Sequence, residues 1–288
     1  MKVLVTGANG QLGRALAQTV PQHIELVALT REQCDLGIAE QCQRSVAEHR
    51  PQLVINAAGY TQVDRAETDS ASAFAVNAEG PAVLAQAAAN VGARFVHVST
   101  DFVFDGNSAR PYLPDAAPNP LSVYGASKLA GERSVAAATD GAAVIVRTAW
   151  VYAAVGANFV NTMLRLMATR EEIGVVCDQI GTPTWARSLA GAVWKAALQP
   201  TLRGILHWTD AGVASWYDFA VAIQEEARAR QLLTREVRIK PIASEEYPMA
   251  ARRPAFSVLD KRSTIAQLQM SPLHWRMNLR MMLDELVR

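Results

Sequence analysis

Short apolar runs alternate with amphipathic, alanine-rich stretches through the first half of the chain. Each run has the length of a buried strand, and each stretch between runs has the residue spacing of a helix. Such an alternation predicts right-handed βαβ units, and therefore a doubly wound parallel sheet with helices on both faces. The predicted strands are Val3–Val5, Ile24–Leu29, Leu53–Ile55, Arg94–Val98 and Ala143–Val146.

The pattern changes in the second half, because the regular alternation ends after Trp150. Residues 106–123 contain four prolines and predict a long loop. We therefore expect residues 1–150 to form the sheet and residues 151–288 to form mainly a smaller α/β part that closes a cleft, with a segment near 178–210 returning to the sheet. Helices are expected at Phe159–Thr169, Arg187–Leu198, Trp216–Ala229 and Leu279–Val287, and short apolar runs at Gly174–Cys177, Ile205–Trp208 and Val237–Ile239.

The first predicted strand ends in three glycines, Gly7, Gly10 and Gly13, and helix-like sequence follows. Gly7 permits a tight turn, Gly10 lets a pyrophosphate approach the backbone, and Gly13 allows close packing of helix and sheet. Backbone N–H groups at Gln11 and Leu12 would then bind the pyrophosphate at the helix N-terminus. The spacing G-x-x-G-x-x-G differs from G-x-G-x-x-G, so a purely structural turn remains the alternative.

The fourth predicted strand delivers Ser99, Thr100 and Asp101 at its carboxyl end. Open parallel sheets bind ligands at that end. Ser99 or Thr100 could hydrogen-bond both a nearby phenol and a substrate carbonyl oxygen. The alternative is that these residues only end the strand and begin a turn.

Tyr124 and Lys128 are four residues apart, so a helix would place a phenol and an ammonium on one face. A nearby cation favours the phenolate, so we expect Lys128 to lower the pKa of Tyr124 and make it a general acid. An exposed tyrosine and a solvated lysine on an ordinary helix are the alternative.

Taken together, these motifs resemble the extended short-chain dehydrogenase/reductase family, which has a Rossmann-like fold. The resemblance implies NAD(P)H-dependent reduction of the C4 keto group of dTDP-4-dehydro-L-rhamnose, a step toward cell-surface polysaccharide. In this role Tyr124 supplies the proton, Lys128 also holds the cofactor ribose, and Thr100 orients the carbonyl oxygen. Further stretches that carry the resemblance are Asn56–Gly59, Thr61–Glu67, Ser99–Gly106, Arg147–Tyr152, Asp178–Thr184 and Arg253–Asp260.

Cofactor choice is expected to depend on Thr30 and Arg31, at the end of the second strand. No carboxylate lies within Ala28–Arg31, and a basic residue accommodates a 2′-phosphate, so we predict a preference for NADPH without excluding NADH. The resemblance places Asp35 and Leu36 at the adenine, although Asp35 could instead cap a helix over Gly37–His49. It also assigns Ala57, Ala58, Gly59, Tyr60, Thr61 and Ser99 to cofactor binding.

Substrate recognition calls for a guanidinium against the diphosphate of a nucleotide sugar. The family pattern places Arg252 and Arg253 near the active site, with a surface arginine pair as the alternative. Trp150 could lie against the deoxysugar ring or could be a core tryptophan. By its family position, Asp101 also lines the sugar pocket.

The composition of the chain limits the kinds of partner that we expect it to bind. Half of the 288 residues are hydrophobic and the formal net charge is +1, so no global field attracts nucleic acid or an anionic membrane. We expect a cytoplasmic protein, since no apolar stretch is long enough to span a bilayer. The three cysteines and five histidines are scattered and predict no metal site.

Assembly is expected to be a monomer or a weak homodimer. Some family members hold magnesium at a dimer interface through acidic residues, one of them just after the third glycine, but here Arg14 and Ala15 follow Gly13. Neither residue offers an oxygen ligand of the kind magnesium needs, so activity should survive chelation.

Two other functions remain as alternatives. A related sugar-nucleotide epimerase or dehydratase would share the fold, but dehydratases usually carry an acidic pair after the catalytic hydroxyl, whereas Phe102 follows Asp101 here. A non-catalytic regulatory subunit would also keep the fold and would need a partner enzyme.

Overall fold

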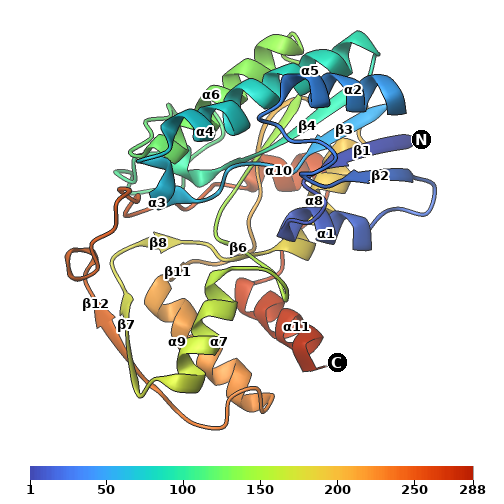
Figure 1. Ribbon diagram of the computed structural model, residues 1–288. Coiled ribbons are helices and arrows are strands. Elements are labelled where there is room, and N and C mark those ends of the chain that lie inside the picture. The colour runs from blue at the N-terminus through green and yellow to red at the C-terminus, as the bar shows by residue number, and fades with distance from the viewer. Residues whose placement is uncertain (288) are drawn as a thin grey trace.

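A computed structural model describes residues 1–287. Its centre is a six-stranded parallel sheet in the order β10-β5-β4-β3-β1-β2 (Figure 1). The chain runs from β1 to β2 on one side and then returns to place β3 on the other side of β1, which creates the switch point where doubly wound sheets bind ligands. The strands are β1 (Lys2–Thr6), β2 (Glu25–Leu29), β3 (Leu53–Asn56), β4 (Arg94–Thr100), β5 (Val144–Thr148) and β10 (Gly204–His207).

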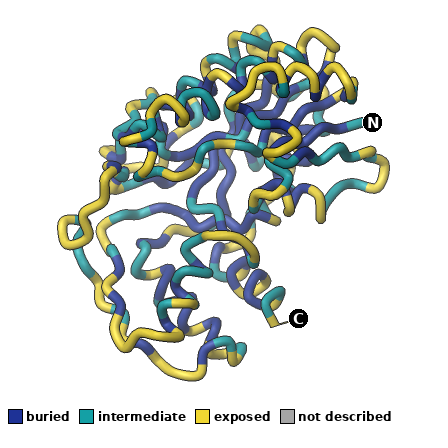
Figure 2. Tube along the Cα trace, in the orientation of Figure 1, coloured by how far each residue is buried: buried dark blue, intermediate teal, exposed yellow. Residues whose placement is uncertain are grey.

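Helices cover both faces of this sheet, as predicted (Figure 1). Alternate residues of each strand point to opposite faces, so Val3 and Val5 pack under one helical layer while Leu4 packs under the other. One layer contains α1 (Gln11–Gln18) and α8 (Ala186–Ala197), and the other contains α2 (Ala39–His49), α5 (Gly80–Asn90) and α6 (Val123–Ala138). The strands between them are the most buried part of the chain (Figure 2).

Short elements connect β3 to α5. They are α3 (Val63–Ala66), α4 (Ser70–Phe74) and a π-helical turn η1 (Ala75–Glu79), which continues directly into α5. After β4 comes a single 3-10 turn, η2 (Asp101–Val103), and Gly106 to Ser122 then form the predicted loop that leads into α6.

The remaining elements form a smaller part with its own apolar cluster around Phe219, Ile223 and Leu279. Its helices are α7 (Phe159–Thr169), α9 (Trp216–Ala229) and α11 (Trp275–Val287). Three strand pairs accompany them: β6 (Val151–Tyr152) with β9 (Thr184–Trp185), β7 (Glu172–Val176) with β12 (Arg238–Ile242), and β8 (Ile180–Gly181) with β11 (Ala214–Ser215). A second 3-10 turn, η3 (Ser244–Glu246), and the short α10 (Arg262–Leu268) complete the fold, and α10 contacts α8 and β10.

Within residues 1–287, none of the helices combines the length and hydropathy that a membrane crossing requires.

Candidate active site

The glycine turn between β1 and α1 is tight enough to exclude side chains. Gly7 has a φ of +73°, and a Cβ there would lie 2.8 Å from the backbone of Ala58. A Cβ on Gly13 would lie 2.1 Å from the carbonyl oxygen of Gly7, so the start of α1 rests directly on the turn. Gly10 is the N-cap of α1 and provides no side-chain cap, which leaves the helix N-terminus open to an anion. These residues fit the diphosphate of a dinucleotide.

Residues 30–37 form a second turn, beside the end of β2. Arg31 Nε lies 3.0 Å from Asp35 Oδ2, and Asp35 Oδ1 accepts a hydrogen bond from the Gly37 backbone N–H at 2.9 Å. Burial alone would raise the pKa of Asp35, but the Gly37 N–H and Arg31 together lower it. The alternative role of Asp35, as the cap of a helix over Gly37–His49, is not what the structure shows, because its carboxylate bonds within the turn and α2 begins at Ala39 after the N-cap Ile38. Leu36 is buried below this turn, whereas Thr30 is partly exposed.

A network that the sequence analysis missed holds the loop after β3. Asn77, in the π-helical turn η1, accepts a hydrogen bond from the Tyr60 N–H at 2.8 Å and donates to the Tyr60 carbonyl oxygen at 3.0 Å and to Ser127 Oγ at 3.0 Å. Asn56 Oδ1 accepts from Thr6 Oγ1 and from the Ala58 N–H. The loop Ala57–Thr61 is therefore tied to β1, to η1 and to α6. The sequence signal for Asn77 was weak, a single amide within an alanine-rich stretch.

Helix α6 places Tyr124 in its first turn and Lys128 one turn later, as the spacing predicted. Its N-terminus is fixed by Ser122, whose hydroxyl accepts a hydrogen bond from the Gly125 N–H. The side chain of Lys128 is buried and donates to the carbonyl oxygen of Val98, on β4, at 2.7 Å. A Cβ built on Gly59 would lie 3.9 Å from Lys128 Nζ, so the ammonium adjoins the loop after β3.

The acidity expected for Tyr124 is not what the structure supports. Burial of the phenol raises its pKa to about 12, a hydrogen bond with Thr100 lowers it in part, and the Asp101 charge raises it again. The expectation that Lys128 lowers the pKa of Tyr124 is therefore wrong, because burial is the largest cause of the shift and the group that lowers the pKa is Thr100 rather than Lys128. Burial also lowers the pKa of Lys128 to about 8, although the charge of Glu132 opposes that shift.

Thr100 is the hydroxyl that β4 brings to Tyr124. Its Oγ1 donates to Asp101 Oδ1 at 3.1 Å and accepts from the Phe102 N–H at 3.2 Å. Ser99 Oγ is buried and has no hydrogen-bond partner among residues 1–287. Of the two candidate hydroxyls, Thr100 is the one whose hydrogen bonding lowers the pKa of Tyr124.

Asp101 is buried next to this hydroxyl, with 2% of its surface exposed. Burial raises the pKa of Asp101 to about 6, although hydrogen bonds with Ser257 and Thr100 oppose that shift. Ser257 is another residue that the sequence analysis missed. It reaches Asp101 from a segment more than a hundred positions away in the chain.

Trp150 lies in a stack at the junction with the smaller part. Its indole is parallel to that of Trp216, with ring centroids 3.5 Å apart and an interplanar angle of 6°. A Cβ on Gly181 would lie 2.5–2.8 Å from three atoms of the Trp150 ring, so this glycine gives the indole its space. Trp150 has a φ of +47°, in the left-handed region that is uncommon for residues other than glycine. Trp216 was not predicted as part of this group.

The two candidate arginines differ in their surroundings. Arg253 forms an ion pair with Asp64 of α3, with nitrogen–oxygen distances of 2.6 and 3.1 Å, while Arg252 is exposed. The sequence analysis did not single out Asp64. It joins α3 to the segment 251–260, and Ser257 of that segment contacts Asp101.

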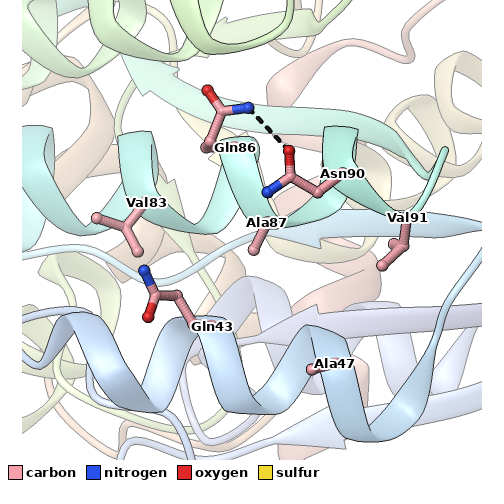
Figure 3. Close-up of a pocket in the computed structure, with 7 residues that line it drawn as sticks. All are labelled: Gln43, Ala47, Val83, Gln86, Ala87, Asn90 and Val91. Carbon is pink, nitrogen blue, oxygen red and sulfur yellow. Dashed lines mark hydrogen bonds between the residues drawn. The ribbon is translucent and has the colours of Figure 1, made fainter.

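A separate hollow of about 360 Å³ lies between α2 and α5 (Figure 3). Apolar side chains and side-chain amides line this hollow, and Gln86 Nε2 donates a hydrogen bond to Asn90 Oδ1 at 3.1 Å. It contains none of the predicted site residues and is lined by Gln43, Ala47, Val83, Gln86, Ala87, Asn90 and Val91. Within residues 1–287, no three His, Cys, Asp or Glu side chains gather closely enough to hold a metal ion.

The chain matches the model of the RmlD substrate binding domain over residues 1–288. Among curated proteins it is similar to dTDP-4-dehydrorhamnose reductase of Burkholderia thailandensis, with 46% identity over 286 residues and 96% of each chain covered. It is also similar to the spore coat polysaccharide biosynthesis protein SpsK of Bacillus subtilis, with 40% identity over 99% of this chain and 97% of that protein.

Solved structures agree with these matches. The dTDP-4-dehydrorhamnose reductase of Bacillus anthracis, solved in complex with NADP, superposes with a TM-score of 0.93 at 36% identity and 99% coverage of both chains. UDP-glucose 4-epimerase of Thermotoga maritima, at 19% identity with 99% of this chain and 98% of that chain covered, has a TM-score of 0.82 and shows the shared fold alone.

Proposed function

Since this chain belongs to the dTDP-4-dehydrorhamnose reductase family, we propose that it catalyses the NADPH-dependent reduction of the C4 keto group of dTDP-4-dehydro-L-rhamnose to dTDP-L-rhamnose. The observation that carries this proposal is the arrangement of Thr100, Tyr124 and Lys128 at the carboxyl end of β4, beside the loop Ala57–Thr61.

Cofactor binding in this proposal uses residues from three turns. The open N-terminus of α1 and the backbone of Gly10, Gln11 and Leu12 bind the diphosphate, and Lys128 and the loop Ala57–Thr61 bind the ribose next to the nicotinamide. Thr30, Arg31, Asp35 and Leu36 surround the adenosine end. When bound, NADPH supplies the hydride, and the Bacillus anthracis relative was solved in complex with NADP.

The chain's own residues supply the proton. Thr100 orients the carbonyl oxygen of the substrate, and the Tyr124 hydroxyl donates its proton to that oxygen as negative charge develops there. A phenol with a raised pKa is protonated at neutral pH, so it is ready to donate. Asp101 lies beside Thr100 and would hydrogen-bond a sugar hydroxyl. Arg252 or Arg253 would neutralise the diphosphate of the nucleotide.

The enzyme that we propose is cytoplasmic, is a monomer or weak homodimer, and needs no bridging metal. The support for the last point is the sequence after Gly13, where Arg14 and Ala15 offer no carboxylate.

The direct test supplies the purified protein with dTDP-4-dehydro-L-rhamnose and NADPH, follows the loss of NADPH absorbance and identifies the product. We expect dTDP-L-rhamnose. Tight retention of NAD with no net oxidation would favour an epimerase instead, and turnover only with an added protein would favour a regulatory subunit.

The Tyr124→Phe variant tests the proton donor, because it removes only the acidic hydroxyl. We expect kcat to fall by ~10²–10⁴-fold while NADPH affinity changes little. Tyr217→Phe, on α9, is the matched control and should retain activity. A fully active Tyr124→Phe variant would rule out this mechanism.

A further inference from the structure

A buried ion pair lies one helical turn beyond Lys128. Arg147 Nε donates to Glu132 Oε1 at 2.9 Å and Arg147 Nη2 donates to Glu132 Oε2 at 2.7 Å, so both carboxylate oxygens are engaged. The two side chains are 2% and 3% exposed. Arg147 also donates to the carbonyl oxygen of Pro114 at 3.2 Å and lies over the Phe104 ring. These contacts fix the orientation of the Glu132 carboxylate.

Glu132 shares one face of α6 with Lys128, because the two residues are four positions apart. Two buried cations, Lys128 and Arg147, therefore adjoin one carboxylate in the described part of the chain: Glu132 is paired with Arg147, and its negative charge also acts on Lys128. Without that carboxylate, both cations would be buried with no opposite charge, which is strongly unfavourable.

The other groups around Lys128 offer it no negative charge. On β4, His97 is fully buried, and burial and then Lys128 hold its pKa well below its ordinary value, so it stays neutral. Val98 contributes a neutral carbonyl oxygen. Tyr124, on α6, is a neutral phenol at the same pH, and the Gly59 backbone completes the surroundings.

We propose that Glu132 is a positioning residue for Lys128: its buried carboxylate, held in place by Arg147, keeps the ammonium protonated beside the loop Ala57–Thr61. Within residues 1–287 the side-chain hydrogen bonds of Glu132 go to Arg147 and not to Tyr124 or the loop Ala57–Thr61, so its effect on the site is exerted through its charge on Lys128. The expected effect of Glu132 on reductase activity rests on the proposed function, whereas its effect on the protonation of Lys128 can be tested independently of that function.

The test measures the titration of Lys128 directly, by NMR of isotope-labelled lysine side chains. The chain has five lysines, Lys2, Lys128, Lys195, Lys240 and Lys261, so the spectrum is simple, and Lys128→Arg assigns the signal. The native ammonium should titrate near pH 8. In Glu132→Gln the midpoint should fall by about one pH unit or more, whereas Glu132→Asp, which keeps the charge, should stay close to the native value.

Glu226→Gln is the matched control. Glu226 is also a buried carboxylate paired with arginines, but it lies on α9, in the smaller part of the molecule. Its loss should weaken the fold without moving the titration of Lys128. If Glu132→Gln does not fold, the double variant Glu132→Met/Arg147→Met removes the ion pair without leaving an unpaired charge. The midpoint should then fall by less than in Glu132→Gln, because the positive charge of Arg147 is lost together with the negative charge of Glu132.

An unchanged Lys128 midpoint in a folded Glu132→Gln or double variant overturns the inference. The high-pH limit of reductase activity should move with the midpoint. If the midpoint shifts but the protein reduces no keto sugar, only the proposed function fails. If the protein is an active reductase and the midpoint does not shift, only the inference about Glu132 fails.

Discussion

At the scale of single residues, desolvation dominates the chemistry of the site. Tyr124, Asp101 and Lys128 all have pKa values moved toward the neutral form, and burial is the largest cause for each. From the sequence, the Tyr-x-x-x-Lys spacing correctly placed a phenol and an ammonium on one helix. The degree of burial could not be read from that spacing, because it depends on β4, η2 and distant segments that pack over the helix.

Asp101 yields a prediction about stability. Its folded pKa of about 6 lies above the ordinary value of 3.8, so the folded state resists ionisation of this carboxyl. Below pH 3.8 the carboxyl is protonated in both the folded and the unfolded protein, so it does not affect stability. As pH rises from 3.8 toward 6, the carboxyl ionises in the unfolded protein only, and the folded state is increasingly destabilised. Above pH 6 this destabilisation is constant, with an upper bound of ~3 kcal/mol. Asp101→Asn should therefore stabilise the protein above pH 6.

Urea unfolding of Asp101→Asn and the native protein at pH 8 and pH 4 measures this effect. The gain should be present at pH 8 and nearly absent at pH 4. An equal gain at both pH values would mean that ionisation is not its source. Activity should fall in the same variant if Asp101 contacts the sugar.

Arg31 yields a prediction about cofactor choice. Its guanidinium is exposed and held by Asp35, beside the end of β2, where it can meet a 2′-phosphate. Residues 28–31 contain no carboxylate, but the turn brings the Asp35 carboxylate to Arg31, where it orients the guanidinium. Arg31→Ala should lower the ratio of kcat/KM for NADPH to that for NADH by ~10-fold or more.

Steady-state kinetics with both cofactors measures this ratio. Arg44→Ala, an exposed arginine on α2, is the control and should leave it unchanged. A clear preference for NADH in the native protein would contradict the assignment of Arg31.

At the scale of elements, hydrophobic patterning predicted what is long and regular. The first five strands and the helices α7 and α9 lie where the pattern placed them, and α11 begins four residues earlier than expected, at Trp275. The two-residue strands of the smaller part could not be predicted, because two residues carry no periodicity. The π-helical turn η1 was also missed, since its extra residue per turn leaves no mark in an alanine-rich stretch.

Gly131 on α6 tests how closely that helix must approach η1. A Cβ there would lie 2.0 Å from the carbonyl oxygen of Asn77, which cannot move without disturbing Tyr60 and Ser127. Gly131→Ala should destabilise the protein by ~1–3 kcal/mol or more and weaken NADPH binding. Gly191 on α8 is the control, since its nearest neighbour is the flexible end of Met270 at 3.4 Å.

Chemical denaturation and a fluorescence titration of NADPH compare the two glycine variants. Gly191→Ala should be neutral or slightly stabilising, because alanine favours helix. If Gly131→Ala is as stable as the native protein and binds NADPH normally, the contact between α6 and η1 is not needed to shape the cofactor loop.

At the scale of the whole molecule, side-chain contacts join the smaller part to the sheet at the site. Asn158 donates to Gln11 at 3.0 Å across 147 positions, and Arg253 binds Asp64 across 189. A local sequence pattern does not contain such long-range pairings, so the sequence predicts the motifs but not their contact partners. The segment 251–260 is held at Asp64 by hydrogen bonds and at Tyr112 by backbone hydrogen bonds, and Ser257 of this segment lowers the pKa of Asp101.

The ion pair of Asp64 and Arg253 allows a final prediction, which distinguishes a structural role of Arg253 from a role in substrate binding. Asp64→Ala removes the ion pair that fixes the segment 251–260 but keeps the positive charge of Arg253. Arg253→Ala removes the ion pair and the positive charge together. If Arg253 also binds the diphosphate, Arg253→Ala should raise KM for the nucleotide sugar by about tenfold more than Asp64→Ala does, since charge-assisted hydrogen bonds to phosphate are strong. The KM for NADPH should change little in either variant. Equal effects would make Arg253 only the partner of Asp64, and an unchanged KM in both Arg253→Ala and Arg252→Ala would exclude both arginines as diphosphate ligands.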